Sequence, residues 1–177
     1  NKHWQVGVED GQQAMRYVRD NAVRLGIDVN KVGIMGFSAG GHLAAIASTH
    51  YAIEGTNTRP DFSILFYPVI TMNKATHGGS RRNLLGDNPS EFDMHRFSLE
   101  EQVTVNTPPT ILLFSDYDPS VPTYNSTAYY EALNKNKIPA TMYIFPVGGH
   151  GWGFKKEFKY HDEMKVLLGK WLDDIKL

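Results

Sequence analysis

The first part of the chain carries apolar residues at helical spacing. They lie on one face of a helix that we expect to run from about Glu9 to Leu25. Gly26 follows at the position where helices commonly end, because glycine readily adopts the left-handed conformation of a helix C-terminus. The apolar positions of this face are Ala14, Val18, Ala22 and Leu25.

Four apolar runs farther along the chain are too short for helices and predict β-strands. They cover residues 32–37, 63–69, 111–115 and 141–147. The second and third runs are almost continuously apolar, which is typical of parallel strands that are buried on both faces.

Helical patterns lie between and after these strands. We expect helices at residues 40–48 and 123–135 and a last one after the fourth strand. The alternation of strand and helix predicts an α/β fold with a parallel sheet. The apolar positions of the last helix are Met164, Leu168, Trp171 and Ile175.

The stretch from residue 71 to residue 109 differs from the rest because it is polar, contains glycine and has no convincing strand. Long insertions inside compact domains are usually functional loops or lids. A chain of 177 residues is long enough for one sizeable core. We therefore expect one domain over residues 1–177, with the insertion at 71–109 as a candidate lid.

Composition and charge narrow the classes of partner. Lys and Arg number 18 against 19 Asp and Glu, so bulk charge predicts neither a nucleic-acid nor a membrane partner. The absence of cysteine excludes disulfides, thiolate metal sites and a cysteine nucleophile. No targeting segment and no membrane-spanning apolar stretch is visible, so we expect a soluble chain whose compartment the sequence leaves open.

Residues 36–40 match the pattern G-x-S-x-G where a predicted strand meets a predicted helix. In that context the pattern forms a sharp turn that holds the hydroxyl of Ser38 clear of the sheet, and its glycines remove side chains that would collide. A glycine-rich turn or a phosphate-binding helix N-terminus is the alternative. We expect Ser38 to be a nucleophile, because a candidate acid and a candidate base follow it.

The candidate acid is Asp118, just beyond the predicted strand at 111–115. A serine hydroxyl needs an imidazole to take its proton and a carboxylate to hold that imidazole. Carboxyl ends of parallel strands are where α/β sheets bind ligands. Asp116 is the rival acid, and we favour Asp118 because residues 119–122 read as a turn ahead of the next helix.

The candidate base is His150, just beyond the predicted strand at 141–147. The glycines at positions 148, 149 and 151 allow a loop that places its imidazole over Ser38. A solvated loop histidine is the alternative. Weaker candidates are His3, His42, His50, His77, His95 and His161.

The rest of the site is less specified. The backbone N–H of Ala39 would donate to the oxyanion, while no HGG-type loop supplies a second donor within the 177 residues. The histidines form no HxH or HExxH pair, so we expect no metal and no cofactor. Aromatic residues beside the three candidates either contact substrate or pack against the core, and they are Phe37, Tyr117, Trp152 and Phe154.

Four stretches of the sequence resemble those of a known protein family. They are GIDVNKVGIMGFSAGGHLA at 26–44, SRRNLLG at 80–86, TPPT at 107–110 and GGHGWG at 148–153. With them the chain resembles bacterial α/β-hydrolase esterases of the acetyl-xylan and feruloyl kind, which lie near the prolyl-oligopeptidase-type hydrolases. The resemblance implies a three-layer sandwich with a largely parallel sheet, and it implies short acyl-ester substrates, particularly acetyl groups on plant-cell-wall sugars. Carried over by position, it gives Ser38, Asp118, His150 and the Ala39 amide the roles above.

The chain also differs from the members of this family. Members usually place several strands and an HGG-type loop before the helix that we expect near Glu9. We therefore expect a short or truncated version of the fold, with the strand at 32–37 at an exposed edge. The chain then either forms a homo-oligomer through that edge or is a natural or engineered truncation of a larger enzyme. The alternatives to an esterase are a prolyl-oligopeptidase-type peptidase and a non-catalytic interaction module.

Overall fold

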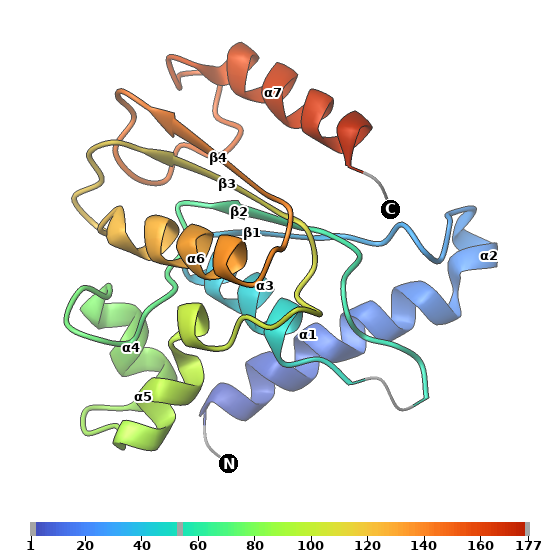
Figure 1. Cartoon of the computed structure of the whole chain (residues 1–177), viewed down its shortest axis with the longest axis horizontal. Coiled ribbons are helices and arrows are strands. Elements are labelled where there is room, and N and C mark those ends of the chain that lie inside the picture. Colours follow the sequence, from blue (N-terminus) through green and yellow to red (C-terminus); the bar gives the residue numbers. More distant parts are fainter. Residues whose placement is uncertain (1–2, 53–54, 176–177) are drawn as a thin grey trace.

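The computed structural model describes residues 3–52 and 55–175, and a four-stranded sheet lies at its centre (Figure 1). All neighbouring strands are parallel, and their order in the sheet equals their order in the chain. The predicted parallel sheet is therefore confirmed. The strands are β1 (Ile34–Phe37), β2 (Ser63–Phe66), β3 (Thr110–Ser115) and β4 (Ala140–Phe145).

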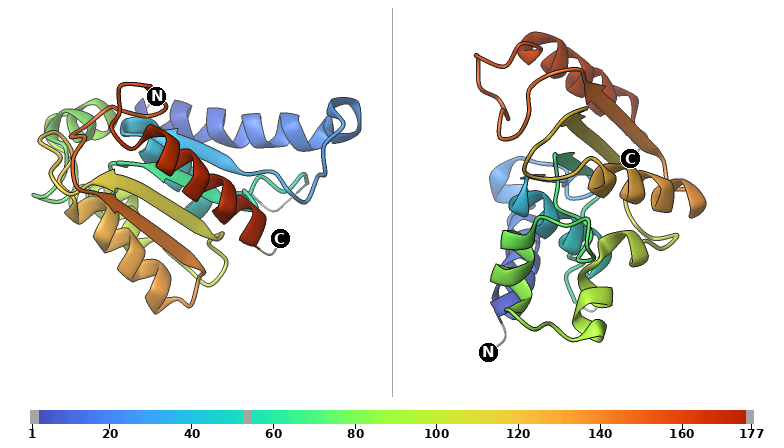
Figure 2. Two further views of the ribbon diagram at one scale, coloured as in Figure 1. Left: turned by 90° about the horizontal axis from the view of Figure 1, so that it is seen from above. Right: turned by 90° about the vertical axis from the view of Figure 1, so that its left-hand side faces the viewer.

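Helices cover both faces of the sheet. Helices α3 (Ala39–Thr49) and α6 (Tyr124–Lys135) lie on one face, and α7 (His161–Asp174) lies on the other (Figures 1 and 2). Helix α1 (His3–Asp20) packs outside α3. This arrangement is the expected three-layer sandwich. Within the described part of the chain, no helix is both long and apolar enough to cross a membrane.

The two middle strands form the centre of the core. Every residue of β2 and β3 is buried, as their continuous apolar runs predict. Strand β1 is an edge strand, and Met35 on it is 48% exposed. The four strands end close to one another, because neighbouring parallel strands place their carboxyl ends at the same edge of a sheet.

The first helix differs from its prediction. It begins at His3 rather than near Glu9, and a separate short helix, α2 (Ala22–Leu25), ends at Gly26 with φ 67°. The early turns escape a periodicity argument because Gly7 and Gly11 face Leu43 of α3, and glycine adds no apolar signal.

Arg19 fastens α1 to the segments that lead into the sheet. Its guanidinium donates to the carbonyl oxygens of Val29 and Arg59, and it forms a 3.0 Å ion pair with Asp61. The same Asp61 oxygen accepts from the backbone N–H of Val32 at 2.8 Å. Arg19 and Asp61 therefore tie α1 to the residues before β1 and β2.

The insertion at 71–109 contains helices that the sequence analysis missed: α4 (Gly78–Leu85), α5 (Glu91–Phe97) and the 3₁₀ helix η1 (Leu99–Glu101). They are short, and α4 buries none of its residues, so no apolar periodicity marks it. Local caps start the two α-helices: the side chain of His77 accepts from the N–H of Ser80, and the side chain of Ser90 accepts from that of Asp93.

Both ends of the insertion are fixed to the core. The buried amide of Asn125 on α6 accepts from the N–H groups of Ile70 and Thr71 at 2.9 and 3.1 Å. It also donates to the carbonyl oxygen of Ala75 at 3.1 Å. At the far end the N–H of Leu99 donates to the carbonyl of Ile70 at 3.1 Å. Helices α4 and α5 lie between these two points.

Candidate active site

Ser38 occupies a strained turn between β1 and α3. Its φ of 54° and ψ of −120° lie in a region that residues other than glycine rarely adopt. Neighbouring backbone holds it there: its N–H donates to the carbonyl of Phe66 at 3.0 Å, and its carbonyl accepts from Val69 at 3.1 Å. Such strain persists only where the surroundings over-determine the conformation, and it is found at functional sites.

Two glycines make this turn sterically possible. A Cβ at Gly36 would lie 2.1 Å from the carbonyl oxygen of Gly40, and a Cβ at Gly41 would lie 2.8 Å from the Cβ of Pro68. A Cβ at Gly40 would meet nothing within 4 Å. The expected steric role of glycine therefore holds for Gly36 but not for Gly40, and Gly41 has the role that the motif pattern did not indicate.

Ser38, His150 and Asp118 form one hydrogen-bonded chain. The Oγ of Ser38 lies 2.8 Å from the Nε2 of His150, and the Nδ1 of His150 lies 2.6 Å from the Oδ2 of Asp118. A carboxylate only accepts, so Nδ1 carries the proton and Nε2 is left to accept the hydroxyl proton of Ser38. The aspartate side chain is 1% exposed and that of the histidine 21%.

The orientation of Asp118 is fixed by its own loop. Its second oxygen, Oδ1, accepts from the backbone N–H groups of Ser120 and Val121 at 2.8 and 2.9 Å. Asp116, the rival acid, is exposed, and its N–H donates to the carbonyl of Phe145 at the end of β4. The turn at 119–122 therefore presents Asp118, and not Asp116, to the imidazole.

The loop that carries His150 depends on glycine. Gly148, Gly149 and Gly151 have φ values of 143°, 60° and 77°. A Cβ at Gly148 would also lie 2.6 Å from the ring of Phe158. A side chain at these positions would be strained or obstructed, so the loop reaches across from β4 to Ser38 because glycine permits it.

Tyr67 belongs to this site and was missed by the sequence analysis. It follows β2 directly, with φ 35°, and its ring centroid lies 4.7 Å from that of His150 at an interplanar angle of 60°. Burial raises the pKa of Tyr67, although a hydrogen bond with the backbone of Gly153 acts in the opposite direction. The apolar run at 63–69 concealed this residue, because it predicts a strand that continues through Tyr67.

The four aromatic candidates for substrate contact lie in different surroundings, and Phe154 lies with its ring centroid 6.2 Å from that of Phe37. Phe37 stacks on Phe66 with centroids 4.7 Å apart. Trp152 is buried, and its indole N–H donates to the hydroxyl of Ser115 at 3.0 Å. Tyr117 is 75% exposed. Their contact with a substrate stays a prediction.

Ala39 begins helix α3 and is exposed. The first N–H groups of a helix have no partner within the helix, and the helix dipole favours negative charge at this end. Because Ala39 directly follows Ser38, its N–H suits the oxygen of a carbonyl under attack. Its role as oxyanion donor stays a prediction.

The other described histidines take no part in the hydrogen-bonded chain of Ser38, His150 and Asp118. His42 is buried, its Nε2 donates to the carbonyl of Phe97 at 2.9 Å, and desolvation lowers its pKa to about 4. Burial also lowers the pKa of His50. The side chain of His3 lies outside the described residues. Among those described, no group of three or more His, Asp or Glu is placed to hold a metal ion. The remaining contacts are His77 with Ser80, His95 with Glu101 and His161 with Asp162.

The sheet is parallel, with a strained serine turn after β1, an aspartate after β3 and a histidine after β4. This arrangement is that of an α/β-hydrolase. Comparison with known proteins identifies the family within this class. The chain belongs to the BD-FAE family, whose model matches residues 1–133.

Individual relatives agree with this family. An acetylxylan esterase of Xylanibacter ruminicola is 41% identical over 175 residues, which is 96% of this chain and 36% of that protein. Endo-1,4-beta-xylanase B of Butyrivibrio fibrisolvens is 43% identical over 152 residues, 81% of this chain and 24% of that protein. The chain therefore spans about a quarter to a third of the length of these two relatives.

Solved structures are similar over nearly the whole chain. An acetyl ester-xyloside bifunctional hydrolase from Caldicellulosiruptor lactoaceticus matches with a TM-score of 0.90 and 38% identity, over 94% of this chain and 64% of that one. A propionate-bound esterase from Thermogutta terrifontis matches with a TM-score of 0.75 and 26% identity, over the same share of each chain.

Proposed function

We propose that this chain carries the catalytic centre of a serine esterase. The observation that supports the proposal most directly is the hydrogen-bonded chain from Ser38 through His150 to Asp118. These are a nucleophile, a base and an orienting acid at hydrogen-bond distances, which is the arrangement that nucleophilic acyl transfer requires.

The reaction proceeds in two halves. The Oγ of Ser38 attacks the ester carbonyl while its proton moves to the Nε2 of His150, and Asp118 stabilises the imidazolium. The Ala39 N–H donates to the carbonyl oxygen as it becomes negative. When the C–O bond of the ester breaks, His150 returns the proton to the leaving alcohol. Water then repeats the sequence on the acyl-enzyme and releases the acid.

The proposed substrates are short acyl esters, and acetyl groups on carbohydrate in particular. The relatives named for acetylxylan esterase and for acetyl ester-xyloside hydrolase support this choice. The propionate-bound structure supports a short acyl group. A chromogenic acetate, p-nitrophenyl acetate, should therefore be hydrolysed, whereas a proline-containing anilide should not be; the reverse preference would indicate a peptidase.

A covalent serine probe tests the nucleophile. A fluorophosphonate should label the wild-type protein and fail to label Ser38→Ala, and labelling that persists in this variant would contradict the assignment. Asp118→Asn should reduce kcat by about 10³ to 10⁴-fold, because the amide favours the wrong imidazole tautomer. The matched control is Asp116→Asn, which should keep nearly full activity because Asp116 is exposed and forms no hydrogen bond with His150.

We also propose that the insertion at 71–109 acts as a lid over the site. Asn125 fixes the start of the insertion and the Leu99–Ile70 hydrogen bond fixes the residues after α5, so the movement would involve the segment with α4 and α5 between them. Helix α4 borders a cavity that also includes Ala39.

Association of two copies through β1 is a further proposal. An edge strand leaves backbone N–H and C=O groups unpaired, and the exposed Met35 adds an apolar side chain beside them. Light scattering after size-exclusion chromatography should give a dimer, and Met35→Lys should give a monomer. A monomeric wild-type protein at micromolar concentration would contradict this proposal.

A further inference from the structure

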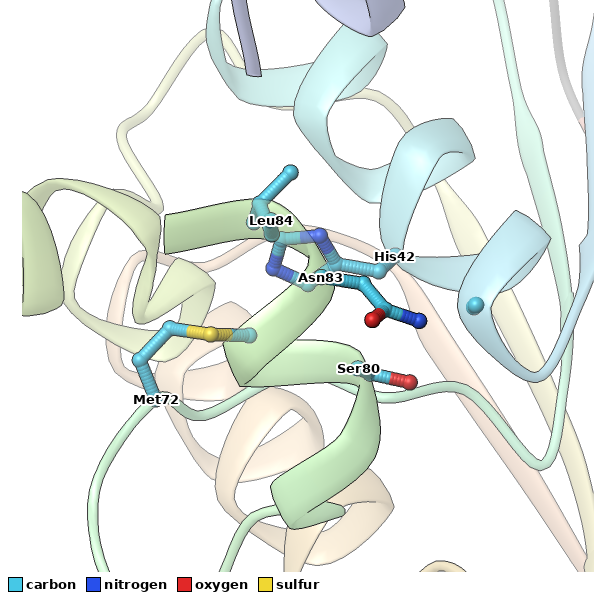
Figure 3. A pocket seen from close by; sticks show the side chains of 6 residues that line it. His42, Met72, Ser80, Asn83 and Leu84 are labelled. Atoms are coloured by element: carbon cyan, nitrogen blue, oxygen red, sulfur yellow. The ribbon is translucent and has the colours of Figure 1, made fainter. Parts of the chain in front are cut away.

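A cavity of about 220 Å³ lies beside the nucleophile turn and has no role in the steps above. Helix α3 supplies one wall and helix α4 the other, and Met72 closes it from the start of the insertion (Figure 3). The cavity shares Ala39 with the proposed oxyanion site, so a group that fills it lies next to a bound ester. Its lining residues are Ala39, His42, Met72, Ser80, Asn83 and Leu84.

Three polar side chains line this cavity. The Nε2 of His42 must carry the ring proton because it faces the carbonyl of Phe97, so the Nδ1 of the neutral ring has a free lone pair. With its pKa lowered to about 4, the ring is neutral near pH 7. Neither this Nδ1 nor the amide of Asn83 forms a hydrogen bond with another described residue. Ser80 is engaged with His77 at 2.9 Å.

The side chains face a common space. Figure 3 shows the Asn83 amide and the Ser80 hydroxyl on the same side of α4, and His42 of α3 lines the same cavity. Met72 and Leu84 add apolar surface to the lining. The cavity therefore offers an acceptor, an amide that both donates and accepts, and apolar contacts.

We propose that this cavity binds the alcohol part of the ester when that alcohol is a sugar or another polyol, with Asn83 and His42 as hydrogen-bond partners of its hydroxyl groups. The inference rests on the proposed esterase function and deepens it. A sugar ring has hydroxyls at its edge for the polar groups and C–H surfaces for Met72 and Leu84.

An acyl chain fits the lining less well. A short acyl chain is apolar, and burying the Asn83 amide and the His42 acceptor against it would leave both unpaired, at a free-energy cost. The volume of 220 Å³ also exceeds the space that an acetyl group occupies. The hydroxyl groups of a sugar would instead form hydrogen bonds with the Asn83 amide and the His42 acceptor.

Two acetate esters of equal ring size test the inference. One is a mono-O-acetylated methyl xyloside, and the other is cyclohexyl acetate, which lacks the hydroxyl groups. Asn83→Leu keeps the side-chain size and removes the amide. It should lower kcat/KM for the xyloside ester by about 3- to 10-fold, as expected for one lost hydrogen bond, and leave cyclohexyl acetate within about twofold of wild type.

The control is Arg82→Gln, on the same helix but outside the cavity lining, which should leave both esters unaffected. An equal loss on both esters in Asn83→Leu would mean that Asn83 acts on the acetyl group or on the fold, and would overturn the inference. So would an equal effect of Arg82→Gln on the xyloside ester.

Binding without turnover provides an independent readout. Titrating methyl xyloside into the Ser38→Ala protein should shift the side-chain amide NMR signal of Asn83 and leave that of Asn136 unchanged, since the latter donates to Ala132 on α6. No shift at tens of millimolar sugar would overturn the sugar site even if esters are hydrolysed. A shift without hydrolysis of any ester would support the site and contradict the esterase proposal.

Discussion

Tyr67 illustrates how single residues position the chemistry. Its ring packs against the imidazole of His150, its hydroxyl contacts the Gly153 backbone of the same loop, and its own backbone is held at φ 35°. A non-glycine residue in this conformation costs on the order of 1–3 kcal/mol and is retained where the surroundings enforce it. Tyr67 is therefore a positioning residue for the imidazole, since it acts through His150.

Replacing the ring should loosen the imidazole. Tyr67→Ala should lower kcat for p-nitrophenyl acetate by about 10-fold or more with little change in KM, because small displacements of a catalytic group are costly. Tyr67→Phe keeps the ring and loses only the hydroxyl contact, so it should retain most of the activity. Steady-state kinetics of both variants provide the measurement, and equal losses would show that the ring itself does not matter.

At the scale of elements, strands and helices with strong patterns were predictable and short polar helices were not. The apolar runs located β1 to β4 within a few residues, and the runs of β2 and β3 are continuous because both strands are buried between two helix layers. Helices α4 and α5 depend on caps and on contacts with distant residues, and these leave no periodic signal. Strand ends were the least certain: β2 ends at Phe66, which hid Tyr67.

The same reasoning explains which parts of the candidate site were predictable. Ser38 lies in a recognisable motif, and Asp118 and His150 follow strands, so their approach to one another follows from parallel topology. The choice between Asp118 and Asp116 depended on a local turn, which the structure contains. The cavity at Asn83 depends on α3 and α4 lining the same space, which the sequence pattern does not encode.

Asn125 on α6 connects the start of the insertion to the core, so its loss should lower the stability of the fold. Asn125→Ala should reduce the free energy of unfolding by about 3 kcal/mol, because the N–H groups of Ile70 and Thr71 would lose their buried partner. Chemical denaturation measures this. Asn136→Ala on the same helix is the control, because Asn136 bonds only its own helix carbonyl at 2.9 Å, and it should cost far less.

Stability of the whole molecule should depend on pH through His42. Burial lowers its pKa to about 4, whereas an unfolded histidine titrates near about 6.5. Between these values the unfolded chain binds a proton that the folded chain does not. The free energy of unfolding should therefore fall as the pH decreases from about 6.5 to 4, by up to about 3 kcal/mol, and level off below.

Urea denaturation between pH 4 and pH 7.5 measures this slope. His42→Gln can still donate to the carbonyl of Phe97 but does not titrate, so the slope should become shallower. His50 contributes in the same direction, because burial lowers its pKa as well, so some slope should remain. An unchanged slope in His42→Gln would contradict the prediction.

The loop with His150 extends from β4, which pairs with β3 alone and has no partner strand on its outer side within the described sheet. The nucleophile stands at the opposite margin, after β1. The two partners of one proton transfer are thus carried by the first and the last strand of the sheet. Any twist, slip or fraying at either margin changes the Ser38–His150 distance before it disturbs the middle of the core, so loss of chemistry should be an early sign that the sheet is loosening.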